Sequence, residues 1–219
     1  SESFAGQNTC PISYIDGRLY TGTWGDDNNA GTYFCIADNG TTCSTEWKQS
    51  DTNGYYWAGA AKVGDWIIFG SDSGKMYSIK ANASNADSIV KSDIKSDDTL
   101  AIESTPTVDD TTNTAYLTTT DATVNNGDRT LSSTGSIYKV NVDSTTGAVS
   151  AGSHYDFKAS KNKPVIYDNY IFVGDNGGKI YAFNKSDLST PLWSATAPGE
   201  VKGEMLISKS TDGSYNIYA

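Results

Sequence analysis

One fifteen-residue pattern occurs twice in this chain. Residues 66–80 read WIIFGSDSGKMYSIK and residues 170–184 read YIFVGDNGGKIYAFN, and the two stretches align without a gap. The identical positions are Ile67/Ile171, Gly70/Gly174, Gly74/Gly178, Lys75/Lys179 and Tyr77/Tyr181. Each copy joins an apolar run to a second run through a turn of Gly, Asp, Asn and Ser, which is typical of a β-hairpin. Its recurrence predicts equivalent units packed side by side.

Two further blocks, 17–38 and 113–142, carry variants of the pattern, and the later one contains a long polar insertion at 119–134. Each hairpin is preceded by a short strand and followed by a fourth. The preceding strands lie in 10–15, 57–63, 104–109 and 162–168. The fourth strands end near Trp47, Val90, Phe157 and Trp193. The second strand of each hairpin opens at a glycine: Gly31, Gly74, Gly135 and Gly178. Four antiparallel strands in roughly 40–60 residues are typical of a β-propeller blade.

The residue pattern of the strands agrees with this interpretation. The runs WIIF and YIFV are continuously apolar, as expected of strands buried on both faces between neighbouring blades. In the strand after the third turn, by contrast, Tyr138, Val140 and Val142 alternate with Lys139 and Asn141. Alternation predicts a half-buried strand further from the propeller axis.

The predicted fold is therefore all-β: a β-propeller, or a propeller segment, of about four and a half four-stranded antiparallel blades in one region, 1–219. The predicted blades are 1–53, 54–102, 103–159, 160–199 and a partial blade at 200–219. Because native proteins avoid open strand edges, we expect either a fragment of a longer chain or an edge that pairs with another copy or chain. The alternative is a small closed ring in which residues 2–6 pair with 214–219.

The stretches FGSDSGKMYSIK and VGDNGGKIYAFN resemble the quinoprotein-type repeat, and Trp47 and Trp193 match the Trp that closes many such repeats. This resemblance covers most of the chain and implies the PQQ-like eight-bladed propeller, a family of quinone-dependent dehydrogenases and of non-catalytic scaffolds of bacterial envelopes. Residues 54–70 are also similar to PQQ-like repeats in large surface proteins of Gram-positive gut bacteria.

The chain departs from the dehydrogenases at the positions that matter for the quinone. No two cysteines are adjacent, and Lys80 and Asn184 stand where the repeat usually has Asp. No carboxylate stands out as the catalytic base. The resemblance therefore implies the fold but not the cofactor, and we expect none, with PQQ or Ca²⁺ as the alternatives.

Charge and hydropathy exclude two classes of partner. The chain has 16 Lys and Arg against 26 Asp and Glu, a net charge of −10, which repels nucleic-acid phosphates. No run approaches the roughly 20 apolar residues that span a bilayer. The chain opens with the polar residues SESFAGQ, so either a leader has been removed or this is an excised piece of a longer protein.

The three cysteines are Cys10, Cys35 and Cys43. A hairpin that turns near residue 39 sets Cys35 opposite Cys43, which permits a cross-strand disulfide in an exported protein. The alternative is two reduced, half-buried thiols. Cys10 is expected to act as a small apolar residue of an inner strand, and three cysteines at these spacings do not make a metal site.

No catalytic residues are predicted. A nucleophilic triad would have to use the single histidine, His154, which lies in a predicted outer strand and is expected to face water. Acidic turns at 25–31, 70–74, 109–113 and 174–178 could bind Ca²⁺, but Asp, Asn and Gly are also what β-turns require. No metal site is predicted there.

The aromatic group Tyr55, Tyr56, Trp57 and Trp66 is the predicted binding surface, because aromatic side chains at a propeller face can stack on sugars or anchor a protein. The alternative is that they pack between blades. The insertion at 119–134 is a second candidate binding element. We expect an exported or cell-surface binding or scaffolding module for a protein or glycan partner. The alternatives are part of a PQQ-dependent dehydrogenase and a carbohydrate-binding propeller.

Overall fold

The computed structural model describes residues 6–25, 30–95, 99–125, 128–211 and 214–219. These residues form strands, turns and loops, with no helix among them, and the strands assemble into antiparallel sheets. The prediction of an all-β propeller of four-stranded blades is confirmed. Since no described segment is helical, none offers a long apolar helix able to cross a membrane.

Four sheets repeat the same plan, in which four antiparallel strands lie side by side in chain order. The first contains β1 (Ser13–Ile15), β2 (Arg18–Gly22), β3 (Gly31–Asp38) and β4 (Cys43–Asp51). The second contains β5 (Ala61–Val63), β6 (Trp66–Gly70), β7 (Lys75–Lys80) and β8 (Val90–Asp93). The third contains β10 (Thr107–Asp109), β11 (Thr114–Thr118), β14 (Thr134–Val142) and β15 (Val149–Lys158). The fourth contains β16 (Val165–Tyr167), β17 (Tyr170–Gly174), β18 (Lys179–Asn184) and β19 (Trp193–Thr196).

The two copies of the repeated hairpin have the same pairing. Ile67 on β6 lies opposite Ile79 on β7, and the corresponding residue of the second copy, Ile171, lies opposite Phe183. The turns match too, since the Gly74 amide donates to the Ser71 carbonyl as the Gly178 amide donates to the Asp175 carbonyl. The sequence repeat therefore encodes a structural repeat, position by position.

Apolar side chains pack between consecutive sheets, in four clusters. One joins the first and second sheets around Tyr33 and Phe69, and another joins the second and third around Ile68 and Leu117. The other two join the third sheet to the fourth, and the fourth to the C-terminal hairpin. β6, with its run WIIF, is buried along its whole length because both faces meet a neighbouring sheet. On β14 the expected alternation is present, with Tyr138, Val140 and Val142 buried.

The short first strands lie at the axis. β1 contacts β5, β5 contacts β10, β10 contacts β16, and β16 contacts β20 (Leu206–Lys209). β20 pairs with β21 (Tyr215–Tyr218), so the final hairpin holds the first two positions of a fifth blade. The alternative of a small closed ring pairs residues 2–6 with 214–219, and residues 2–5 lie outside the described residues. Gln7, just beyond them, forms an isolated bridge with Trp24 of the first blade.

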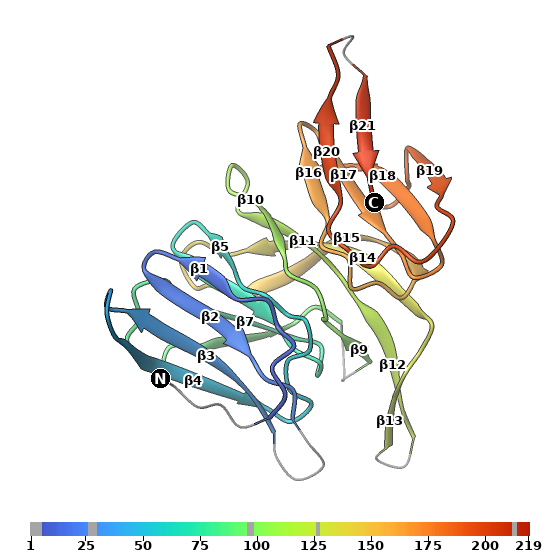
Figure 1. Ribbon diagram of the computed structural model, residues 1–219. Helices are drawn as coiled ribbons and strands as arrows, with labels where there is room; N and C mark the ends of the chain where they lie inside the picture. The colour runs from blue at the N-terminus through green and yellow to red at the C-terminus, as the bar shows by residue number, and fades with distance from the viewer. Residues whose placement is uncertain (1–5, 26–29, 96–98, 126–127, 212–213) are drawn as a thin grey trace.

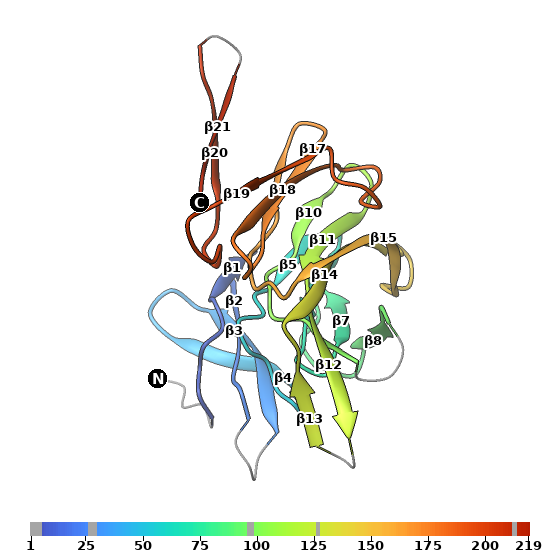
Figure 2. The same cartoon turned by 90° about the vertical axis from the view of Figure 1, so that its right-hand side faces the viewer.

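One face of the molecule carries most of the long connections. In each blade the first strand ends in a tight turn on the opposite face of the molecule. Because neighbouring strands are antiparallel, the loops after β2, β4, β6 and β15 all lie on this one face. The insertion at 119–134 forms a hairpin of β12 (Thr120–Asn125) and β13 (Asp128–Leu131), and β12 also pairs with β9 (Leu100–Ala101). This hairpin projects on the same side as the end of β2, as both views show (Figures 1 and 2). We call this side the loop face.

Candidate functional site

The loop face contains a cavity of about 990 Å³, which we call the loop-face cavity. Its walls come from the connections of the first blade, the turn after β6, the segment before β10, the β13 strand and the segment before β16. Ligand sites in proteins commonly measure about 300–1,000 Å³, so this cavity lies at the upper end. The side chains that give it its chemistry are Trp24, Tyr56, Asp72, Glu103, Arg129 and Lys161.

Asp72 is a buried acid of the cavity with a raised pKa. Its side chain sits in the β6–β7 turn, the residue is 5% exposed, and one carboxylate oxygen accepts a hydrogen bond from the Tyr56 amide at 3.2 Å. Burial, followed by the negative charge of Glu103, raises the pKa of Asp72 to about 8. At neutral pH this carboxyl is therefore mostly protonated, and it can donate as well as accept a hydrogen bond.

Glu103 is only 1% exposed, yet both of its carboxylate oxygens have partners. One accepts a hydrogen bond from the Thr120 hydroxyl at 3.1 Å, and the other pairs with the Lys161 ammonium at 3.0 Å. The Lys161 ammonium also lies over the Tyr56 ring, 4.1 Å from its centroid, and 5.2 Å from the Trp57 ring. Lys161 thus joins the carboxylate to the aromatic side chains by a charge pair and cation–π contacts.

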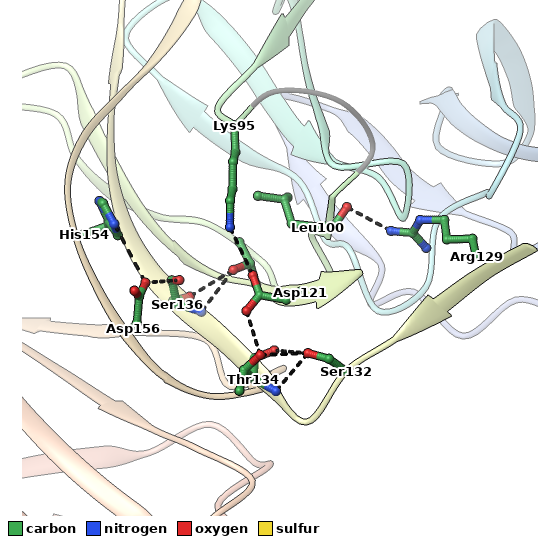
Figure 3. A network of polar contacts seen from close by, with 10 residues as sticks. Lys95, Leu100, Asp121, Arg129, Ser132, Thr134, Ser136, His154 and Asp156 are labelled. Carbon is green, nitrogen blue, oxygen red and sulfur yellow. Dashed lines mark hydrogen bonds and ion pairs between the residues drawn. The ribbon is translucent and has the colours of Figure 1, made fainter. Parts of the chain in front are cut away.

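Arg129 reaches the cavity from β13, and its guanidinium donates to the Leu100 carbonyl at 2.9 Å. Polar contacts fix the base of this hairpin (Figure 3): Asp121 on β12 pairs with Lys95 at 3.3 Å and accepts a hydrogen bond from the Thr134 hydroxyl at 2.8 Å. The polar insertion therefore forms an arm that is anchored to the second and third blades. Its Thr120 and Ala122 are buried.

Trp57 has a backbone conformation that bulky residues rarely adopt, with φ of 62°. The residues on both sides hold it there: the Tyr56 amide donates to Asp72, and the Ala58 carbonyl accepts a hydrogen bond from the Tyr33 hydroxyl at 3.0 Å. The turn at Trp57 directs Tyr56 to the loop-face cavity. Trp57 itself lines a smaller cavity of about 370 Å³ near the axis, which also borders Lys161.

The structure divides the predicted aromatic surface in two. Tyr55 is fully buried between the first and second blades, where its ring lies 5.0 Å from Tyr33 and 6.0 Å from Phe69. Trp66 is buried between the second and third blades, and its indole N–H donates to the Ser144 carbonyl at 3.0 Å. Tyr56 and Trp57 are half-buried and line the two cavities. The alternative of packing between blades is thus realised by Tyr55 and Trp66.

The predicted pairing of Cys35 with Cys43 is wrong in its geometry. The turn falls between Asp38 and Cys43, which lie opposite each other, and a bulge after Cys35 sets that residue opposite Trp47. The prediction assumed a tight turn centred on residue 39 and a regular ladder beyond it. The observed loop between Asp38 and Cys43 is longer, and the bulge adds one unpaired residue. All three cysteines are free, with Cys10 and Cys35 buried and Cys43 exposed.

His154 lies on β15, the outermost strand of the third blade, and is exposed as expected. Its ring stacks on Tyr138 at 5.0 Å, and its Nε2 lies 3.7 Å from Asp156, as drawn in Figure 3. In the acidic turns, Asp109 accepts hydrogen bonds from Thr111, and Asp175 accepts them from the amides of Gly177 and Lys179. Along the described residues no three His, Cys, Asp or Glu side chains gather as a metal ion requires.

The sequence interpretation named none of the residues Trp24, Asp72, Glu103, Arg129 and Lys161. It did consider the segments of two of them, since Asp72 lies in the acidic turn at 70–74 and Arg129 in the insertion at 119–134, the second candidate binding element. The blade repeat contains a signal that could have found two of them. Trp24 and Asp72 each come two positions after the last residue of a blade's second strand, Gly22 and Gly70 respectively. Equivalent positions of a propeller meet around the axis on one face, so these two positions could have been grouped.

Comparison with known proteins identifies the architecture. No family model and no curated protein matches the sequence. Among solved structures, BamB from Moraxella catarrhalis is similar at 16% identity and a TM-score of 0.51, over 99% of this chain and 71% of that one. Quinohemoprotein alcohol dehydrogenase ADHIIG from Pseudomonas putida HK5 is similar at 13% identity and a TM-score of 0.65, over 99% of this chain and 39% of that one. A europium-containing methanol dehydrogenase is similar at 11% identity and a TM-score of 0.63, over 95% of this chain and 50% of that one.

This chain thus spans half or less of the two dehydrogenases. At such low identities the likeness concerns the fold alone. The sequence repeat, the four-stranded sheets, the apolar layers between them and these structural neighbours lead to one conclusion: the chain has a β-propeller fold.

Proposed function

We propose that this protein is an exported, cell-surface binding module that holds its ligand in the loop-face cavity. The observation that carries the proposal is the combination of a large open cavity, an aromatic side chain exposed in it, and buried charged groups beneath. Trp24 is 46% exposed although it adjoins the packed first blade. Concave sites with aromatic walls and a few oriented polar groups are typical of ligand binding.

The scaffold supports binding because the site is preorganised. Asp72 and Tyr56 are fixed to each other, Glu103 is held by Thr120, and the β12–β13 arm is anchored at its base. Side chains whose positions are set by the fold lose little conformational entropy when a ligand arrives. The cell-surface location rests on the similarity of residues 54–70 to repeats of bacterial surface proteins.

The quinone chemistry implied by the fold family does not fit these residues. PQQ is a tricarboxylate, so it needs cations that are not already neutralised. Near the axis, Lys163 pairs with Glu204 at 2.6 Å, Lys202 with Glu200 at 2.5 Å and Lys161 with Glu103 at 3.0 Å. Each ammonium has a carboxylate partner, and the cysteines are not adjacent. We therefore propose no quinone for this chain.

A retention experiment tests the binding face. Protein is mixed with insoluble bacterial cell walls, and the bound fraction of wild type, Trp24→Ala and Trp193→Ala is compared. Trp193 is a matched control because it is 43% exposed and lies on β19, away from the loop-face cavity. We expect wild type and Trp193→Ala to be retained and Trp24→Ala to be lost. Retention that does not depend on Trp24, or no retention, would refute binding through this face.

Titration with PQQ and Ca²⁺ tests the alternative function, part of a PQQ-dependent dehydrogenase. We expect no bound-quinone absorbance and no alcohol-dependent dye reduction. Stoichiometric quinone binding would instead favour a dehydrogenase part.

A further inference from the structure

Trp24 provides an aromatic surface that the described chain covers only in part. Its backbone is fixed, since its amide donates to the Gln7 carbonyl at 2.8 Å. Its ring contacts Tyr56 at a tilted 52° with centroids 5.7 Å apart, which leaves nearly half of the residue open to the cavity. An exposed indole gains free energy when an apolar surface covers it. The C–H face of a pyranose ring is one such surface.

The neighbouring aromatic position already contains a cation. The Lys161 ammonium lies 4.1 Å from the Tyr56 centroid and pairs with Glu103. A cationic ligand would have to displace this internal ammonium from both contacts. The cavity therefore disfavours cations, although aromatic side chains and carboxylates are the groups that usually bind them.

The charged groups of the lining already have partners within the protein. At neutral pH the protonated Asp72 carries no charge, the Glu103 carboxylate pairs with the Lys161 ammonium, and the Arg129 guanidinium donates to the Leu100 carbonyl. An apolar ligand would leave buried polar groups without hydrogen bonds, which costs free energy. A neutral ligand rich in hydroxyl groups avoids this cost, because each hydroxyl can donate and accept.

Asp72 suits a hydroxyl particularly well. Within the described part of the chain its carboxyl accepts one hydrogen bond, from the Tyr56 amide, although the residue is 5% exposed and lines the cavity. Its pKa of about 8 keeps it mostly protonated at neutral pH, so it offers a donor and an acceptor together.

We propose that the loop-face cavity binds a neutral oligosaccharide, with a pyranose ring stacked on the Trp24 indole and a sugar hydroxyl hydrogen-bonded to the Asp72 carboxyl. This inference rests on the proposed binding function and adds the ligand class. The size of the cavity, about 990 Å³, accommodates several sugar units of a chain.

Calorimetric titration tests the inference with cello-, xylo-, manno-, malto- and chitohexaose, and with hexagalacturonate as an acidic comparison. We expect at least one neutral hexaose to bind wild type and Trp193→Ala equally. Trp24→Ala and Asp72→Ala should each weaken that binding by about tenfold or more. Asp72→Asn should stay within about threefold at pH 6, because the amide preserves one donor and one acceptor.

Three outcomes would overturn the inference: no neutral hexaose binding at about 10 mM, equal binding by Trp24→Ala, or binding of hexagalacturonate alone. The retention experiment separates the two proposals. If cell-wall retention depends on Trp24 but is abolished by protease treatment of the walls, and no hexaose binds, the binding face stands and its ligand is a protein. If retention is independent of Trp24, the binding function itself fails at this face.

Discussion

Gly70 lies directly against Ile102: a Cβ built on Gly70 would fall 2.6 Å from the Ile102 Cβ. The same contact recurs one repeat later, where a Cβ on Gly174 would fall 2.5 Å from the Val201 Cβ. The backbones are joined in the same way, since the Ile102 amide donates to Ser71 and the Val201 amide to Asp175. The glycine that ends each of these second strands therefore lets the chain entering the next blade pass close by.

We expect Gly70→Ala to destabilise the protein by about 1–3 kcal/mol, because the added methyl must displace the fully buried Ile102. Gly199→Ala is the control, since a Cβ there meets no atom within 4 Å. Urea unfolding measures both. A Gly70 variant as stable as wild type would mean that the close approach is absent in solution.

Asp72 predicts a specific dependence of stability on pH. Its pKa rises from 3.8 to about 8 on folding, so between these values the folded protein retains a proton that the unfolded chain has released. The contribution of Asp72 to stability is therefore full below about pH 4, falls as pH rises, and is lost above about pH 8. Asp72→Asn removes this pH-dependent contribution to stability, because the amide does not titrate.

Thermal melts of wild type and Asp72→Asn at pH 5 and pH 8 measure the effect. We expect the Tm of wild type to fall by several degrees more than that of the variant between these two pH values. Parallel falls would show that the carboxyl ionises normally.

The buried Asp51 carboxylate is held by the tyrosine of the repeat. The Tyr77 hydroxyl donates to it at 2.6 Å, whereas the repeat-equivalent Tyr181 donates to Asp175 at 3.2 Å. We expect Tyr77→Phe to cost about 1–3 kcal/mol, because it removes a short hydrogen bond to a buried charge. Tyr181→Phe should cost less. Chemical denaturation of the two variants checks this order, and the reverse order would contradict the geometry.

The cysteines should react in a fixed order. Burial raises the pKa of Cys10 and of Cys35 to about 12, whereas Cys43 is exposed at the start of β4. Native protein should therefore take up one alkyl group from iodoacetamide, at Cys43, and denatured protein three. Intact-mass spectrometry under non-reducing conditions counts them. A mass two hydrogens lower, with no alkylation at Cys43, would instead show that the Cys35–Cys43 disulfide forms.

The blade repeat was readable in the sequence because it is local. Each hairpin carries its own apolar runs and turn residues, and Gly70 and Gly174 stand at matching positions. A strand buried on both faces must be apolar throughout, so the run at Trp66–Gly70 already indicated packed neighbours. Period and strand pattern together limited the chain to a propeller architecture.

The cysteine pairing and the aromatic surface could not be decided this way. A single extra residue, the bulge after Cys35, changes which side chains face each other, and no residue pattern announced it. Adjacent aromatics diverged for a similar reason: Tyr55 enters the layer between blades while Tyr56 lines the cavity, because the backbone turns at Trp57. Such turns depend on contacts with other blades.

The sequence by itself determined the blade and its repeat, because these follow from the order of residues within some tens of positions, and its composition determined the net charge of −10. The tertiary structure alone decided the candidate site. The side chains of the cavity come from segments far apart in the chain, and they meet because the blades arrange around one axis. They are Trp24, Asp72, Glu103, Arg129 and Lys161. The burial that raises the pKa of Asp72 likewise exists only once those blades have packed.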